Sequence, residues 1–337
     1  MKAFVLAAGI GERLKPLTND IPKPMIPILD KPVLYYTFVN LKKNGIYSIC
    51  VNLHHCPNII KNFFKKNNIG IELIFSYEKK LLGTAGAIKK VEYLFNDTFL
   101  VMSGDGLTNI KLKNAIEFHK KKKSLATIIL KKIESKFKYG FAIVNKDFKI
   151  RSFIEKPLWN DIFENNVNTG IYIFDPKIFK FIPENKFFDF SSDLFPLLIK
   201  KKEKIYGYIM NEYWIDIGSF SEYRKGVFDV LDGKVNIDVE NKNYKHLGNN
   251  LQIDKTVKIY APCFIGNNVV IGRNAIINPY SVISDNVNIR SNVFLEESIV
   301  LENSKIGKNV RIKNTIVGHN TVIPCNISLF DSVVIGT

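Results

Sequence analysis

The stretch that decides the fold is residues 1–32, MKAFVLAAGIGERLKPLTNDIPKPMIPILDKP. Its apolar run over residues 3–7 has the length and composition of a buried strand. A glycine bend follows at residues 9–11, and beyond it lie Arg13 and then Lys23 between two prolines. Glycines after a strand let backbone N–H groups approach an anion, and the two cationic side chains can hold a polyphosphate. The pattern alone predicts either a phosphate-binding turn or an ordinary turn.

Length and composition limit the possible functions. With 337 residues, 46% hydrophobic and 24% charged, the chain is typical of a soluble globular protein with two cores. The net charge of +16 comes from scattered lysine runs without interleaved aromatic residues, so we expect no nucleic-acid partner. We interpret the abundance of Lys, Asn and Ile as a bias of genome composition. The absence of long apolar runs and of CxxC pairs predicts a reduced, cytoplasmic protein without a membrane partner.

Strands and helices alternate over the first two-thirds of the chain. We expect strands at residues 3–7, 46–53, 71–77 and 98–102, and helices at residues 31–44, 57–67 and 85–95. This order predicts a Rossmann-like, mostly parallel sheet with helices on both faces. Ligands bind beyond the carboxyl ends of the strands in such sheets. Residues 9–13 and Asp105 both fall at such strand ends.

Asp105 and Asp216 are the strongest candidates for metal ligands. Asp105 follows an apolar strand and Gly104, and Asp216 ends a second short apolar run ahead of Gly218. Carboxylate oxygens are the hard ligands that Mg²⁺ prefers, usually one or two of them together with phosphate oxygens. For Asp105 alone, a residue that caps the next helix is an equally good interpretation.

The opening stretch resembles the signature of the sugar-1-phosphate nucleotidyltransferases. The string LAAGxGxRLxPLTxxxPKPMxP, residues 6–27, carries the resemblance, and later motifs extend it over nearly the whole chain. The family attacks the α-phosphorus of a nucleoside triphosphate with a sugar 1-phosphate and releases pyrophosphate. The resemblance implies Mg²⁺ held by Asp105 and Asp216, and catalytic roles for Arg13, Lys23 and Asp105. It implies nucleotide contacts from Leu6, Ala8, Gly9, Gly11, Arg13, Lys23, Glu78, Leu82, Gly83 and Thr84.

Two later groups of motifs resemble the family's base and sugar sites. Residues 82–86, LGTAG, resemble the nucleotide-base loop, at a helix start where bare N–H groups face the ligand. Glu78 falls where the family places a base-reading side chain, and its acceptor-only carboxylate suits the donors of guanine. A solvated glutamate at a strand end is the alternative. The resemblance implies sugar-phosphate contacts from Gly140, Glu155, Lys156, Asn168, Thr169 and Gly170.

The periodicity changes near residue 251. Isoleucine or leucine recurs every six residues from Ile253 to Leu295, and a second file of slim residues runs from Val257 to Val293. A six-residue period indicates a hexapeptide β-helix, here resembling the left-handed parallel form. The frame slips after Leu301, which predicts an irregular last coil. We therefore expect a catalytic domain at residues 1–233, an irregular linker at 234–250 and a left-handed β-helix at 251–337.

Within the family, the order of motifs resembles the mannose-1-phosphate guanylyltransferases. This implies GTP and mannose 1-phosphate as substrates, Mg²⁺ as cofactor, and a homo-oligomer formed partly through the β-helix. At the position of Glu12 the family usually has a small residue. Because of this difference, transfer of a uridylyl, thymidylyl or adenylyl group remains an alternative. Two other classes remain: a hexapeptide acyltransferase using His319, and a non-catalytic regulatory subunit, which should have lost the charged residues that this chain retains.

Overall fold

Strand β1 (Ala3–Leu6) lies between β6 (Phe99–Ser103) and β4 (Ser48–Leu53) in a nine-stranded sheet. The structure is a computed structural model that describes residues 1–133, 140–154, 166–235 and 245–336. Strand β1 is parallel to both neighbours, and β4 is parallel to β5 (Glu72–Tyr77). Because successive side chains of a strand point to opposite faces, Ala3 and Val5 join one core and Phe4 joins the other. The predicted buried first strand is confirmed.

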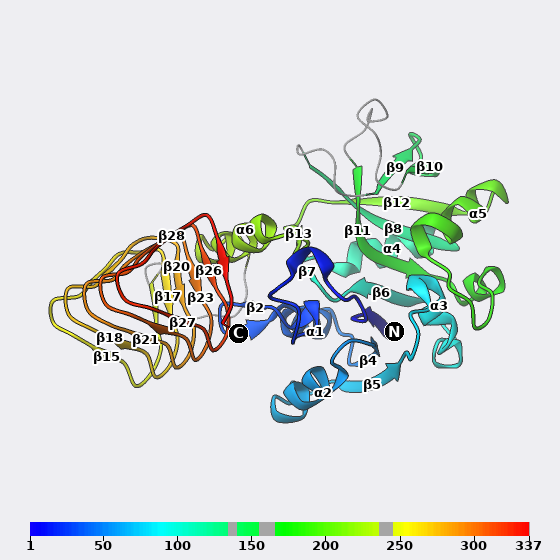
Figure 1. Cartoon of the computed structure of the whole chain (residues 1–337). Helices are drawn as coiled ribbons and strands as arrows, with labels where there is room; N and C mark the ends of the chain where they lie inside the picture. Colours follow the sequence, from blue (N-terminus) through cyan, green and yellow to red (C-terminus); the bar gives the residue numbers. More distant parts are fainter. Residues whose placement is uncertain (134–139, 155–165, 236–244, 337) are drawn as a thin grey trace. The chain divides into compact units, whose positions relative to one another are not determined.

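The remaining strands make the sheet mixed. Strand β11 (Asn166–Phe174) runs antiparallel to β6, and from it the sheet extends in two directions (Figure 1). On one path it continues through β9 (Phe141–Val144) and β10 (Ile150–Ile154), and on the other through β8 (Ala126–Lys132) and β12 (Ile205–Met210).

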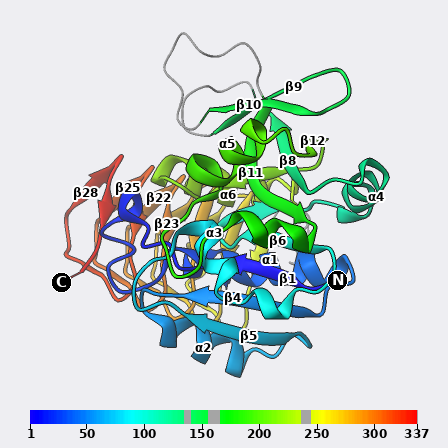
Figure 2. The same ribbon diagram turned by 90° about the vertical axis from the view of Figure 1, so that its right-hand side faces the viewer.

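Helices cover both faces of this sheet, as the order of elements predicted (Figures 1 and 2). One core receives apolar residues from α1 (Val33–Lys43), α2 (Pro57–Lys66) and α4 (Leu112–Lys122). The opposite core receives them from α3 (Gly83–Lys89) and α5 (Phe195–Lys200). The helix expected at residues 85–95 is shorter: it starts at Gly83, and a separate 3-10 turn, Glu92–Leu94, follows it.

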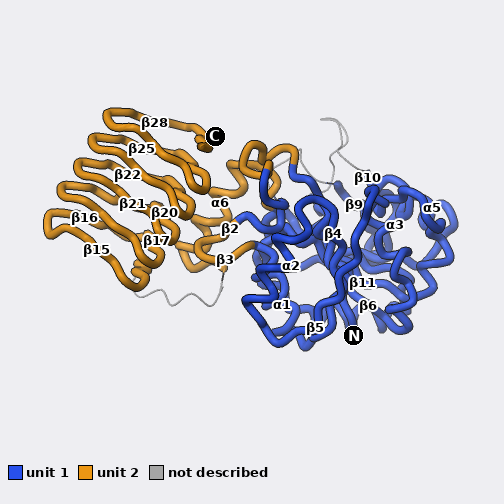
Figure 3. The backbone as a smooth tube through the Cα atoms, turned by 60° about the horizontal axis from the view of Figure 1, so that its bottom comes forward, with its two compact units in different colours: residues 1–11, 20–26, 33–216 blue, residues 12–19, 27–32, 217–337 orange. Residues whose placement is uncertain are grey.

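Contacts divide the chain into two units that alternate along the sequence (Figure 3). The first unit contains Met1–Gly11, Asp20–Ile26 and Val33–Asp216, and the second contains Glu12–Asn19, Pro27–Pro32 and Ile217–Thr337. The opening 32 residues, which we treated as one stretch, therefore contribute to both units. The domain boundaries expected from the sequence stay predictions.

The second unit contains a left-handed β-helix, which confirms the expected fold. Its strands form three parallel sheets. The first sheet contains β14 (Lys245–Leu247), β17 (Cys263–Ile265), β20 (Ser281–Ile283), β23 (Ile299–Val300), β26 (Ile316–Val317) and β29 (Val333–Val334), and the second contains β15 (Gln252–Ile253), β18 (Val270–Ile271), β21 (Asn288–Ile289), β24 (Lys305–Ile306) and β27 (Val322–Ile323). The third sheet contains β16 (Lys258–Ile259), β19 (Ile276–Ile277), β22 (Phe294–Glu296), β25 (Arg311–Lys313) and β28 (Ser328–Phe330). The files at six-residue spacing point inward; Ile277, Ile283 and Ala275, for example, are fully buried.

Two expectations about the β-helix are wrong. Residues 245–247 belong to the segment expected to be irregular, yet they form β14 and pair in parallel with β17. The last coils are regular as well. Val270 pairs with Asn288, 18 residues on, whereas Val282 pairs with Ile299, only 17 residues on. The coil is shortened by one residue at a corner, so the six-residue frame slips while the strands stay in register.

The corners of the β-helix explain much of its asparagine content. Asn268, Asn286 and Asn303 have positive φ angles of 56°, 59° and 62°, a conformation that asparagine tolerates better than most residues. Their side chains stack in a ladder, because each amide nitrogen donates to the next amide oxygen at 3.1 Å. Asn274, Asn292, Asn309 and Asn326 form a second ladder at another corner.

Helix α6 (Phe220–Leu231) packs within the same unit, along the corner where the coil is shortened. Arg224 donates to the main-chain and side-chain oxygens of Asn314. The rings of Phe228 and Tyr280 lie 5.0 Å apart, and the Tyr280 hydroxyl donates to Asp232 at 2.9 Å. These contacts join α6 to the β-helix side chain by side chain.

Candidate active site

The two candidate metal ligands are brought together by a short antiparallel pair of strands. Strand β7 (Gly106–Thr108) follows Asp105 directly and pairs with β13 (Trp214–Asp216). In that register Asp216 lies opposite Gly106, the residue next to Asp105. Three backbone pairs thus bring together two residues that are far apart in the sequence. Both aspartates belong to the first unit.

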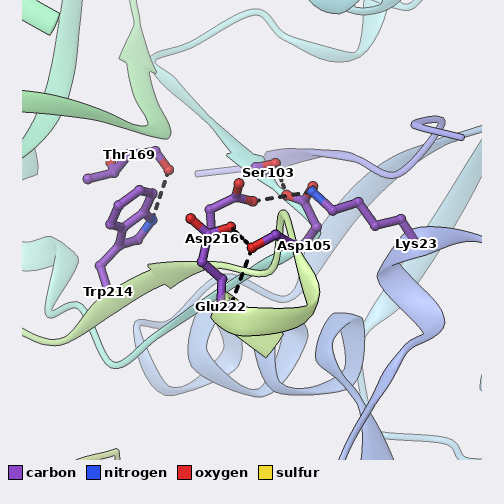
Figure 4. A network of polar contacts seen from close by, with 8 residues as sticks. Lys23, Ser103, Asp105, Thr169, Trp214, Asp216 and Glu222 are labelled. Carbon is purple, nitrogen blue, oxygen red and sulfur yellow. Dashed lines mark hydrogen bonds and ion pairs between the residues drawn. The ribbon is translucent and has the colours of Figure 1, made fainter. Parts of the chain in front are cut away.

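The Lys23 ammonium lies between these carboxylates (Figure 4). It donates to Asp105 and, at 3.3 Å, to Asp216, and the three side chains are 11–20% exposed. Burial opposes the charge of Lys23, but the two carboxylates outweigh it and raise the pKa of the ammonium above its ordinary value. Burial likewise opposes ionisation of Asp105, and the Lys23 charge reverses this and lowers the pKa of the carboxyl.

This arrangement fits a divalent cation. A lysine ammonium held by two carboxylates shows that this pair accepts a cation, and the oxygen donors are those that Mg²⁺ takes. Among the described residues there is no group of three His, Cys, Asp or Glu side chains suited to a metal. Two carboxylates leave the remaining coordination positions to water and phosphate, which is usual for Mg²⁺.

Sequence reasoning missed the residues that support Asp105. The Ser103 hydroxyl donates to the Asp105 carboxylate, and a Cβ at Gly104 would lie 2.9 Å from the Leu6 carbonyl oxygen. The Gly104 amide instead donates to that oxygen at 2.9 Å. Glycine is thus needed where the strand end meets β1. The tripeptide Ser103-Gly104-Asp105 is the sequence signal for the roles of Ser103 and Gly104 beside Asp105.

The expected sugar residues of β11 lie against the same strand end. Gly170 has a φ of +73°, and a Cβ there would lie 3.0 Å from the Ser103 Cβ. Its amide donates to Asn168 at 3.0 Å, while the Thr169 hydroxyl donates to the Ile129 carbonyl at 2.8 Å. The Trp214 indole donates to the Thr169 carbonyl at 3.0 Å (Figure 4), which ties this part of β11 to β13.

Other sugar contacts are resolved only in part. The Gly140 carbonyl accepts from the Asn168 amide at 2.8 Å, so these two expected residues are neighbours. Glu155 and Lys156 lie outside the described residues. The sugar-binding roles of all these residues stay predictions.

The base loop differs from expectation at the start of α3. The amides of Ala85 and Gly86 both donate to the Phe188 carbonyl at 2.9 Å, so they are not bare. The Thr84 hydroxyl donates to Asp189 at 2.7 Å and accepts from the Phe190 amide at 2.8 Å. The carbonyl of Leu82 accepts from the Phe188 amide at 2.9 Å. A Cβ at Gly83 would lie 2.5 Å from the Phe188 oxygen, which explains its glycine.

Glu78 is not a solvated strand-end residue, because it is only 2% exposed. Its carboxylate accepts from the side chain of Asn52 at 2.8 Å and from the amide of Leu82 at 2.9 Å. Asn52, another residue that sequence reasoning missed, also accepts from the Ala7 amide at 2.7 Å. Guanine reading by Glu78 stays a prediction.

The expected phosphate turn leaves space beside Gly9. A Cβ at Gly9 would meet no atom within 4 Å, and Gly11 has a φ of +77°. Leu6 and Ala8 precede the turn, and Ala8 is 5% exposed. Arg13 lies in the second unit, in a 3-10 turn, Glu12–Leu14, whereas Lys23 lies in the first. The unusual Glu12 is paired with Lys15 at 2.8 Å and is mostly exposed.

The candidate acyltransferase base has one acidic neighbour. His319 Nδ1 lies 3.5 Å from a carboxylate oxygen of Glu302, one coil away, and this contact lowers the pKa of Glu302.

Across the parts of the chain that the structure describes, no helix combines the length and apolarity needed to cross a membrane.

Residues 2–233 match the Nucleotidyl transferase family. The chain belongs to that family. Residues 259–337 match the GMPPB C-terminal domain. A UTP–glucose-1-phosphate uridylyltransferase of Synechocystis sp. is 33% identical over 80% of each chain. A mannose-1-phosphate guanyltransferase of Debaryomyces hansenii is 30% identical over 77% of this chain and 73% of its own length.

A solved structure supports the same placement in the nucleotidyl transferase family. HddC from Yersinia pseudotuberculosis is 30% identical, with a TM-score of 0.60 over 68% of this chain and 99% of HddC. HddC has also been solved in a complex with GMP-PN. The family of this protein therefore contains sugar-1-phosphate nucleotidyltransferases that differ in their nucleotide and sugar.

Proposed function

We propose that this protein is a mannose-1-phosphate guanylyltransferase, which forms GDP-mannose and pyrophosphate from GTP and mannose 1-phosphate. The observation that carries the enzymatic part is the pair Asp105 and Asp216 sharing one cation within the first unit. Guanylyl transfer is supported by the match to the GMPPB C-terminal domain and by the guanyltransferase relatives.

In the proposed reaction the protein contributes position and charge. Mg²⁺ held by Asp105 and Asp216 would neutralise charge on the reacting phosphates. Arg13 and Lys23 would bind the pyrophosphate that leaves, and Lys23 is the cation already present at the carboxylates. Asn168 and Gly170, with Glu155 and Lys156, would orient the sugar phosphate for in-line attack. Alignment of the two phosphates supplies much of the rate in such reactions.

Glucose-1-phosphate uridylyl transfer is the second candidate, favoured by the Synechocystis relative that is 33% identical. Pyrophosphate release, measured across a grid of GTP, UTP, dTTP and ATP with mannose and glucose 1-phosphates, separates the two. We expect the highest kcat/KM for GTP with mannose 1-phosphate. A preference for UTP would refute the guanylyl assignment, and release with no pair would favour a regulatory subunit. Consumption of acetyl-CoA would indicate the acyltransferase class.

A further inference from the structure

Buried hydrogen bonds connect the turn after β1 with the base loop after β5. Asn52 accepts from the Ala7 amide at 2.7 Å through Oδ1 and donates to Glu78 Oε1 at 2.8 Å through Nδ2. Glu78 Oε2 accepts from the Leu82 amide at 2.9 Å. Asn52 and Glu78 are 3% and 2% exposed, so water does not compete for these bonds. We call Asn52 and Glu78 together the loop bridge.

The sheet explains why Asn52 can reach both sides. Strand β4 lies between β1 and β5, and Asn52 pairs with Ser76 of β5 close to the carboxyl end of the strand. The amide has one favourable orientation, because a flipped side chain would place its nitrogen against the Ala7 N–H and its oxygen against the carboxylate. His54, two residues further along, holds the Glu78 backbone: its Nδ1 lies 2.8 Å from the Glu78 carbonyl, which can only accept.

We propose that Asn52 is a positioning residue that fixes the separation of the two nucleotide-binding loops, acting through Glu78. The proposal rests on the proposed function only in taking these loops as the sites of triphosphate and base. Glu78 then acts on the Leu82 amide rather than on the base. Removing a buried donor to a carboxylate leaves that charge short of a partner, so the loops should lose their fixed separation.

Glu78→Gln discriminates between bridging and base reading. Glutamine keeps the shape but turns one carboxylate oxygen into a nitrogen donor, which must face either Asn52 Nδ2 or the Leu82 N–H. Both of those groups are donors, so the bridge breaks whichever nucleotide is bound. The bridge therefore predicts the same weakening for GTP and UTP, whereas base reading predicts a loss for GTP alone.

Equilibrium binding of GTP and UTP with Mg²⁺ to the full chain tests this. We expect Kd to rise about tenfold for both nucleotides in Asn52→Ala and in Glu78→Gln. Under turnover, the KM for the nucleotide should rise while the KM for sugar phosphate stays unchanged. Asn40→Ala is the matched control, because Asn40 is also buried and donates at 3.3 Å to the Ile110 carbonyl, away from both loops. A GTP-selective loss in Glu78→Gln would overturn the proposal.

A double variant that combines Asn52→Ala with Glu78→Gln distinguishes loss of the loop bridge from simple unfolding. Asn52→Ala removes the donor that would oppose the nitrogen introduced by Glu78→Gln. The second substitution should therefore weaken binding less in that background than in the wild type. Additive losses would contradict a bridge that acts as one unit. Melting temperatures of all variants, with Asn40→Ala beside them, show whether general destabilisation accounts for the change.

Hydrogen exchange on the nucleotide-free protein tests the bridge without any activity. Peptides covering residues 4–11 and 79–88 should exchange faster in Asn52→Ala than in wild type. In Asn40→Ala their exchange rates should equal those of wild type. If neither peptide changes, the proposal is wrong even in an active enzyme. If both change but wild type releases pyrophosphate with no substrate pair, the proposed function fails and the bridge survives.

Discussion

At the scale of residues, the candidate active site holds two carboxylates that share one ammonium. Lys23 supplies one ammonium to the carboxylates of Asp105 and Asp216. If Asp105 and Asp216 hold Mg²⁺, as proposed, Lys23 and the metal ion would compete for the same two carboxylates.

Removing either carboxylate charge should stop the reaction without unfolding the protein. Asp105→Asn and Asp216→Asn keep the side-chain shape but each withdraws half of the carboxylate set. We expect turnover to fall at least ~100-fold in saturating Mg²⁺, because little charge neutralisation remains. Steady-state pyrophosphate release, with circular dichroism as the folding control, measures this. A near-normal rate for either variant would remove that aspartate from the site.

Lys23→Met should expose the competition between lysine and metal. Without nucleotide, millimolar Mg²⁺ should raise the melting temperature of the variant by roughly 2–4 °C more than that of wild type. Turnover should fall as well. Lys89→Met is the matched control, because Lys89 is 12% exposed and pairs with Glu92 at 2.7 Å. An equal response to Mg²⁺ in all three proteins would show that Lys23 does not occupy the metal position.

The sequence allows residues at strand ends to be placed, but not residues whose contacts depend on neighbouring strands. Asp105 and Asp216 each follow an apolar run, and the structure brings them together. Asn52 looks like any polar residue inside a strand, since its partners lie 45 and 26 residues away. The amides of Ala85 and Gly86 appeared bare only because Phe188, far along the sequence, was not in view.

At the scale of elements, the corner positions of the β-helix require a residue that adopts a positive φ angle more than they require an asparagine side chain. We expect Asn292→Ala to lower the free energy of unfolding by about 1–2 kcal/mol, since alanine resists the positive φ and the bonds to Asn274 and Asn309 are lost. Asn292→Gly loses the bonds but accepts the φ, so it should be less harmful. Urea unfolding compares them; a glycine variant as unstable as alanine would contradict this account.

Helix α4 contains a pH-dependent contact with β8. His119 is 3% exposed and lies 2.9 Å from the Thr127 hydroxyl, and burial lowers the pKa of its imidazole to about 4. The unfolded chain therefore binds a proton that the folded chain rejects, and stability is lost as pH falls from about 6.5 towards 4.

The loss attributable to His119 should reach about 2–3 kcal/mol. His119→Asn keeps a group that can bond Thr127 but does not titrate there, so its stability should vary less with pH. Urea midpoints at about pH 7 and about pH 4.5 measure the difference, with His55→Asn as a histidine control outside this contact. Parallel pH profiles for wild type and His119→Asn would refute the assignment.

At the scale of the whole molecule, the chain passes between the two units five times, because six segments alternate between them. The sequence showed the change of period near residue 251 but not this alternation, which depends on contacts rather than on pattern. Helix α6 illustrates the difference. The catalytic domain expected at residues 1–233 includes this helix, yet the helix contacts Tyr280 and Asn314 of the second unit.

Deleting residues 251–337 should therefore do more than remove a contact surface for other subunits. Helix α6 loses the partners of Arg224, Phe228 and Asp232, so the 1–250 fragment should melt at a lower temperature than the full chain. If the β-helix also carries assembly, size-exclusion chromatography should show fewer subunits. A fragment with unchanged subunit number would place assembly outside the β-helix.

Asparagine side chains deamidate as a protein ages, so the two ladders should lose hydrogen bonds over time. An Asn286 converted to aspartate still accepts from Asn268, but it donates nothing to Asn303 and adds a charge to the column. The conversion begins when the next backbone nitrogen attacks the side chain. Branched, fully buried residues such as Val287 hinder that attack. Within the two ladders, Asn303, followed by the small Ser304, is where we expect mass spectrometry of stored protein to find the first lost amide.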